Sequence, residues 1–192
     1  MLTMRNIYNI FRNIFLITIV AAMASGVINR ADAAYTLTLS SPNPAVPAAS
    51  ICQGTLKAQV YSFTITSVGT SGTIPTFTGM NFTTTGTYTA TDILKFQVWR
   101  NTANNLSTAT QMTPDITATL GPGAHSITFT SAYSLTGVAS PGTTHYFWIT
   151  IDVAATPVGG HTLGVSAIAP ANLTTTTVTP TGSTFAGGTQ TL

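Results

Sequence analysis

The sequence contains very little charge. Lysine, arginine, aspartate and glutamate together make up 5% of its 192 residues, and glutamate does not occur at all. Soluble globular proteins carry roughly 25% charged residues. The shortage does not indicate disorder, because disordered chains are rich in charge and poor in apolar residues, whereas 44% of this chain is hydrophobic.

The few charges also cancel over most of the chain. From Ala34 onward three positive side chains face three negative ones: Lys57, Lys95 and Arg100 against Asp92, Asp115 and Asp152. A net charge near zero favours association between copies. The absence of a basic patch argues against nucleic-acid binding, which depends on releasing counterions from phosphates. We therefore expect copies of the same chain as partners and no nucleic acid.

Cysteine and long helix-forming segments are scarce as well. The single cysteine, Cys52, permits no internal disulfide. We expect a buried or unreactive thiol, and the alternative is a cross-link between two subunits. After residue 34 no segment shows the period of a helix, whereas threonine and β-branched or aromatic residues abound. These residue types suit a pleated, half-buried surface.

Residues 1–33 are predicted to be a secretory signal peptide. Arg5 and Arg12 precede an apolar run over residues 14–24, the order of charge and hydrophobicity that export signals show. Cleavage is expected after Ala33, with Ala24 as the alternative. The apolar run is shorter than the ~20 residues needed to span a bilayer. We therefore expect an extracellular or bacterial cell-surface protein without membrane association after cleavage.

The first segment after the signal is predicted to be a tethered strand. Residues 35–39 alternate between apolar and hydroxyl side chains, as a half-buried strand does. Residues 40–47 contain three prolines, which break strands. The chain thus divides into residues 34–52, a strand with its proline-rich linker, and residues 53–192, the main domain.

Residues 53–192 are predicted to form an all-β, antiparallel sandwich of the immunoglobulin-like or jelly-roll-like kind. Glycine and proline recur about every ten residues, the turn spacing of such folds. The predicted strands cover residues 60–66, 77–84, 93–100, 126–130, 146–153, 163–168 and 174–179. Residues 146–153 form the strongest strand, which we expect to be central and buried on both faces.

Several stretches resemble the sialidase N-terminal, or BNR-associated N-terminal, domain family. They are residues 82–87 (FTTTGT), 90–93 (ATDI), 105–111 (NLSTATQ), 145–153 (HYFWITIDV) and 160–163 (GHTL). The resemblance implies a β-sandwich from a secreted surface protein of Bacteroidetes-type bacteria, where the domain is usually an accessory module. It does not imply sialidase activity, because the region from Ala34 has one arginine and no glutamate.

No combination of residues points to catalysis, a metal or a cofactor. The three histidines, His125, His145 and His161, stand in no metal-binding or nucleophile motif. The carboxylates after residue 34 are far apart in the sequence, and calcium would require several oxygen ligands. We therefore predict a protein that is not an enzyme and carries no cofactor.

Two functions remain open from the sequence. The first is a self-assembling subunit of an extracellular filament or surface layer, in which Tyr35, Leu37 and Leu39 insert into a neighbouring copy. The alternative is that the same strand folds back onto its own domain. The second function is a monomeric adhesive or carbohydrate-binding module that recognises glycans or a host surface. Its candidate stacking residues are Trp99, Tyr88 and Tyr133, whereas Trp148 is expected in the core.

Overall fold

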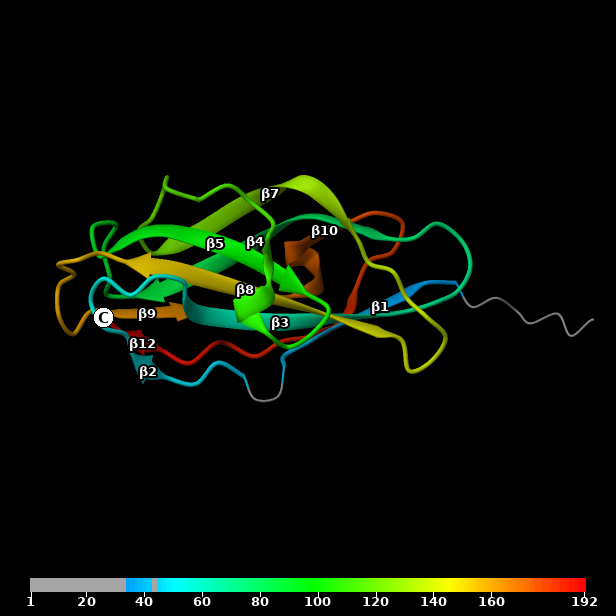
Figure 1. Cartoon of the computed structure of the whole chain (residues 1–192), viewed down its shortest axis with the longest axis horizontal. Helices are drawn as coiled ribbons and strands as arrows, with labels where there is room; N and C mark the ends of the chain where they lie inside the picture. Colours follow the sequence, from blue (N-terminus) through cyan, green and yellow to red (C-terminus); the bar gives the residue numbers. More distant parts are fainter. Residues whose placement is uncertain (1–33, 43–44) are drawn as a thin grey trace, which may run out of the picture. The chain divides into compact units, whose positions relative to one another are not determined.

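The computed structural model describes residues 34–42 and 45–192, so the predicted signal peptide and its two cleavage sites lie outside the described residues. The described part is all-β apart from two 3₁₀ turns, η1 (Leu106–Thr108) and η2 (Pro170–Asn172). None of its helices is long and apolar enough to cross a membrane. The all-β class expected from the alternating segments is confirmed (Figure 1).

Two sheets pack as a sandwich. The first has the order β11 (Thr181–Ser183), β1 (Thr36–Ser40), β3 (Ala58–Val68), β8 (Thr143–Val153), β5 (Ile93–Asn101) and β6 (Thr110–Gln111). The second has the order β10 (Leu173–Thr175), β4 (Thr76–Gly86), β9 (Thr162–Val165), β12 (Gln190–Thr191) and β2 (Ala49–Ser50), and β7 (Gly123–Ser134) also pairs with β4.

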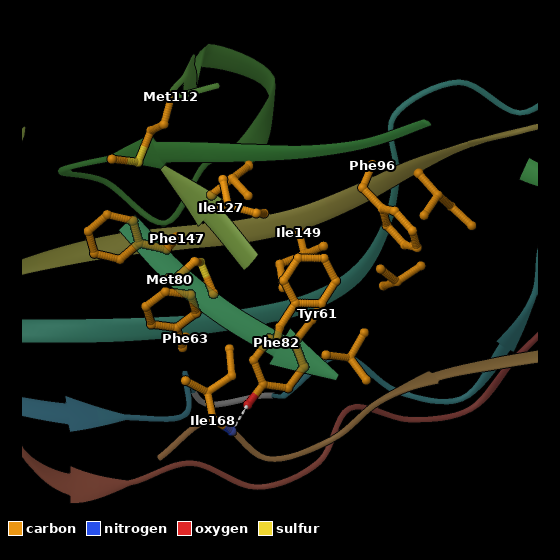
Figure 2. Close-up of a cluster of buried hydrophobic side chains, with 14 of the residues drawn as sticks. Tyr61, Phe63, Met80, Phe82, Phe96, Met112, Ile127, Phe147, Ile149 and Ile168 are labelled. Atoms are coloured by element: carbon orange, nitrogen blue, oxygen red, sulfur yellow. Dashed lines mark hydrogen bonds between the residues drawn. The ribbon is translucent and has the colours of Figure 1, made fainter. Parts of the chain in front are cut away.

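The core lies between the sheets and is rich in aromatic rings. Phe63 of β3 stacks on Phe147 of β8 with ring centroids 5.0 Å apart, and Phe77 of β4 meets Phe147 edge to face. Figure 2 shows Phe63, Phe147 and Met80 grouped in this way. Each buried side chain of this size contributes about 1.5–3 kcal/mol to folding.

Strand β8 is central, between β3 and β5, and both of its faces are buried, as expected. Phe147, Ile149 and Ile151 face the core, so Trp148 and Thr150 face the outside of the first sheet. Trp148 is nevertheless only 2% exposed. A loop and the N-terminal segment cover this outer face, as described below.

Not all of the strand pairs are antiparallel. β1 pairs with β11 in parallel, and β2 pairs with β12 in parallel. The two parallel pairs arise because both ends of the described chain run in the same direction from the first sheet to the second. We call residues 36–42 and 45–51 the N-terminal segment and residues 181–192 the C-terminal segment. In Figure 1 the blue-to-cyan and red segments run beside each other.

Hydrogen bonds hold these two segments together between their strands. Phe185 N–H donates to Ser41 Oγ at 2.8 Å, and Gly188 N–H donates to the Val46 carbonyl at 2.9 Å. The Gln190 side chain donates to the Pro47 carbonyl at 2.9 Å. The linker is therefore paired with the C-terminal segment on both sides of residues 43–44.

Two glycines allow this close approach. A Cβ atom at Gly182 would overlap the Leu39 carbonyl oxygen, and one at Gly188 would overlap backbone atoms of Pro47 and Ala48. Gly182 also has a φ of 93°, in a region that favours glycine. Side chains at these positions would push the two segments apart.

Candidate functional site

Buried histidines serve as hydrogen-bonding groups within the sandwich. His125 Nε2 lies 2.9 Å from Thr84 Oγ1, and its ring stacks on Phe82. The ring nitrogens of His145 lie 2.8 Å from the Tyr133 hydroxyl and 3.0 Å from the Thr136 carbonyl oxygen. Burial lowers the pKa of both imidazoles, so both rings are neutral at neutral pH.

Asp92 and His161 join two turns that lie far apart in the sequence. Asp92 is 1% exposed and accepts hydrogen bonds from Thr89 N–H, Val158 N–H and His161 Nδ1. Burial alone would raise the pKa of this carboxyl, but the bonds from His161, Val158 and Thr89 outweigh it and hold the pKa well below its ordinary value. The carboxylate is therefore ionised, as a structural brace.

A second ionic cluster lies on the outer face of the first sheet. Lys95 Nζ is 2.7 Å from Asp115 and 3.2 Å from Asp152. Its hydrogen bond to Asp115 raises the pKa of the lysine and lowers the pKa of Asp115 to about 2. An isopeptide bond between Lys95 and Asp115 would need a neutral amine and a protonated acid. The pKa shifts of both groups favour their charged forms, so the contact is an ion pair. No group of three His, Cys, Asp or Glu that could hold a metal occurs in residues 34–42 and 45–192.

The three predicted stacking residues do not form one surface. Tyr88 is 1% exposed, and its hydroxyl lies 2.6 Å from Thr84 Oγ1. The prediction of an exposed ring was wrong for Tyr88, because the threonine-rich turn around it folds the ring into the core. Both other rings are half-buried and carry a cation: Lys57 Nζ lies 3.6 Å from the Trp99 ring centre, and Arg100 lies 4.1 Å from that of Tyr133.

The predicted donor residues lie in the chain's own sandwich. Leu37 and Leu39 are each 1% exposed, and β1 pairs with β3 from Thr36 to Ser40. Tyr35 is half-buried. The sandwich of a single copy thus includes the strand that the sequence analysis placed outside the main domain. Cys52, expected to be buried or unreactive, is free and exposed.

A groove of about 420 Å³ lies on the outer face of the first sheet. We call it the outer groove. Its floor is formed by Gln59, Ser62 and Trp148, and Gln190 also lines it. One wall is the N-terminal segment, with Pro42, Ala45, Val46, Pro47 and Ala49; the other wall is the loop after β5, with Asn104 and Leu106. In Figure 1 the green segment with η1 crosses in front of β8 and β3.

The wall that carries η1 is fastened to the sheet by Lys57. Its ammonium group donates to the Leu106 carbonyl at 3.0 Å while it covers the ring of Trp99. Ser62 and Trp99 each lie directly opposite Trp148 on the neighbouring strands. Ser62, Trp148 and Trp99 therefore form a row across the outer face of three strands.

Trp148 lines the groove, although it was expected in the core because residues 146–149 form one apolar run. The alternation of the whole strand carries the missing signal: Tyr146, Trp148, Thr150 and Asp152 share the outward face, and the polar pair marks that face as outward.

No family model matches this sequence, and no match was found among curated proteins. The resemblance to the sialidase N-terminal family therefore stays a prediction.

Proposed function

We propose that the chain is a non-enzymatic, secreted structural protein that assembles with copies of itself into an extracellular filament or surface layer. Assembly would use exchange of the N-terminal segment, which would leave one copy and complete the sandwich of the next. Because each copy would donate to one neighbour and accept from another, the contact would propagate instead of closing.

The observation that carries the proposal is that Leu37 and Leu39, which lie on β1 at the start of the described chain, are buried in the sandwich. Each is 1% exposed, so the sandwich without β1 would expose their apolar sites. An identical strand from a second copy offers the same side chains in the same register. Exchange therefore changes which copy makes the contacts, while the contacts themselves are kept.

The pairing of the two ends defines the unit that would move. The linker is bonded to the C-terminal segment, and Ile51 N–H still donates to the Thr191 carbonyl at 2.8 Å. The hinge therefore follows Ile51 and precedes β3, which begins at Ala58. Gly54 and Lys57 have positive φ angles in this stretch, and Leu56 is 68% exposed. If the whole segment as far as Ile51 is exchanged, it forms the same bonds with the C-terminal segment of the copy that receives it.

Low charge supports association between copies. The six charged side chains among the described residues all contact a partner: Lys57 with Leu106 and Trp99, Arg100 with Tyr133, Lys95 with Asp115 and Asp152, and Asp92 with His161. Little net charge is left to keep copies apart.

A cross-link between β1 and β3 tests the exchange. Thr38 lies opposite Thr66, and antiparallel partners have the Cα spacing that a disulfide needs. Thr38→Cys with Thr66→Cys, in a Cys52→Ser background, should form a bond within one copy when oxidised before assembly, and this locked chain should no longer polymerise. Oxidation after assembly should link different chains into a ladder on a non-reducing gel.

The matched control is Thr66→Cys with Thr144→Cys, a pair on β3 and β8 that does not involve the N-terminal segment. This bond should stay within one chain before and after assembly and should leave polymers intact in electron micrographs. Bonds that stay within one chain in polymers of the Thr38 variant would reject segment exchange. A wild-type chain that is monomeric at all concentrations would reject self-assembly.

A further inference from the structure

One buried hydroxyl group in the outer groove lacks a hydrogen-bond partner. Ser62 is 6% exposed, and its Oγ bonds to no atom of the described residues. Among the buried side-chain atoms of the described residues, only Thr113 Oγ1, outside the groove, also lacks a partner. A buried hydroxyl without a partner costs about 1–3 kcal/mol. Because Ser62 lines a groove of about 420 Å³, a group that enters the groove can supply the missing bond.

The residues around Ser62 select a neutral ligand with both hydroxyl groups and apolar faces. None of the side chains that line the outer groove is ionisable. The amides of Gln59 and Asn104 can both donate and accept hydrogen bonds. The side chains of Leu106 and of the prolines in the N-terminal segment provide apolar contact. Sugar rings combine these features, since their hydroxyl groups lie around rings with apolar C–H faces.

The floor of the groove argues against an extended peptide. A peptide that adds to a sheet needs a free strand edge with unpaired backbone groups. Here the floor is the face of β3 and β8, which lie inside the first sheet and pair with neighbours on both sides. The groove therefore offers side chains and no free edge. Its volume is near the lower end of the ~300–1,000 Å³ typical of small-molecule sites, which suits one or two sugar rings.

We propose that the outer groove binds a neutral saccharide of one or two rings, with Ser62 Oγ bonded to a sugar hydroxyl and the apolar side chains of the groove walls against a ring face. In a single copy all residues that line the groove belong to one chain. After exchange of the N-terminal segment the same wall would come from the neighbouring copy, so the groove would keep the same lining residues in both states. It differs from the stacking surface that the sequence predicted around Trp99, Tyr88 and Tyr133.

Saturation-transfer NMR on the purified protein tests the proposal with cellobiose, lactose and N,N′-diacetylchitobiose as probes. The method observes the sugar protons, so it works whether the chain is single or assembled. Concentrations up to about 10 mM cover the millimolar affinities of weak sites. We expect saturable transfer to at least one probe, together with a change in tryptophan fluorescence that persists in Trp99→Phe, where Trp148 is the only tryptophan.

Variants in the groove give the decisive comparison. Ser62→Ala should weaken binding about 2–12-fold, the factor expected for one neutral hydrogen bond, and should leave folding intact because this hydroxyl has no protein partner. Asn104→Ala, in an exposed loop, should also weaken binding. The matched control is Thr113→Val, which removes the other unpaired buried hydroxyl and should leave binding unchanged.

Three results would overturn the proposal. The first is the absence of saturable transfer from all three sugars, which would leave water as the partner of Ser62. The second is equal affinity in the wild-type chain and in Ser62→Ala. The third is binding of a neutral peptide unrelated to residues 35–40 in place of every sugar, with that binding weakened in Ser62→Ala, which would make the groove a peptide site.

Discussion

At the scale of single residues, Asp92 concentrates more polar contacts than its neighbours. Besides three bonds from Val158, His161 and the Thr89 backbone, it accepts one from the Thr89 hydroxyl at 3.0 Å. Asp92→Asn keeps the shape of the side chain and removes its charge. We expect a loss of about 2–4 kcal/mol in the free energy of unfolding, because buried donors lose an ionised acceptor.

Urea denaturation at neutral pH would measure this loss. Asp115→Asn is the matched control, since the Asp115 side chain is 42% exposed and its bonds compete with water. A loss at Asp92 as small as that at Asp115 would contradict its role as a brace. A small loss of unfolding free energy in the control would show that the large loss at Asp92 comes from the burial of its carboxylate, since both substitutions remove the same charge.

The buried histidines predict a loss of stability in mild acid. Burial lowers the pKa of His125 and of His145 in the folded state, whereas the unfolded residues titrate near about 6.5. As the pH falls below that value, the histidines of the unfolded chain become protonated while those of the folded chain stay neutral, so the free energy of unfolding decreases.

Thermal unfolding between about pH 7.5 and 5 would detect this decrease as a falling midpoint. His125→Gln removes one titrating group and should give a shallower decrease, even if the variant is less stable at every pH. A midpoint that is constant or rises toward pH 5 would contradict the assignment of neutral imidazoles.

Exposure of single aromatic residues was the least predictable property. The sequence around Tyr88 is rich in threonine and suggests a surface turn, yet the ring is buried because Thr84 offers its hydroxyl a partner inside the sandwich. Trp148 lies on the outward face and is still 2% exposed, because a loop far from it in sequence covers that face. Both outcomes depend on long-range contacts that local patterns do not contain.

At the scale of elements, strands rich in apolar residues were predictable and the last two strands were not. β8 was expected from its run of apolar residues and β1 from its alternation of apolar and hydroxyl side chains, and the structure confirms both as strands. β11 and β12 are short and lack such a pattern: TGS and QT. They are strands because the N-terminal segment lies beside them, so only the paired structure reveals them.

The contact between the two chain ends predicts a strong effect of a single methyl group. Gly188→Ala places a Cβ atom against backbone of Pro47 and Ala48, which cannot rotate away. We expect a loss of about 1–3 kcal/mol in the free energy of unfolding, as in overpacked interiors. Chemical denaturation would measure it.

Gly159→Ala is the matched control for Gly188→Ala. A Cβ atom there would meet nothing within 4 Å, so the control should be neutral or slightly stabilising. Equal effects of the two substitutions would mean that the linker is not held against the C-terminal segment.

At the scale of the whole molecule, the last residues connect both sheets and the core. Thr184 Oγ1 lies 2.6 Å from the Tyr61 hydroxyl and accepts from Ile168 N–H at 2.7 Å. Tyr61 itself accepts a bond from the same N–H, drawn as the dashed line in Figure 2. Leu192 is buried as well. The C-terminal segment is therefore a structural part of the sandwich.

A chain that ends at residue 180 should not unfold cooperatively. It would lose β11, β12 and the Thr184 hydrogen bonds, and β1 would keep only β3 as a neighbour. Near-ultraviolet circular dichroism and urea denaturation would test this. A synthetic peptide of residues 181–192 should restore the signal of packed aromatic rings. A sharp unfolding transition without the peptide would contradict the expectation.

The parallel pairing of β1 with β11 also determines when folding can finish. Thr38 is paired with Thr181, so this contact closes a loop that contains nearly all of the described chain. Contacts between residues so distant in sequence form late and slow folding. During synthesis, β1 is made long before β11, which follows it by more than a hundred residues. The native sandwich can therefore be completed only after residues 181–183 have left the ribosome.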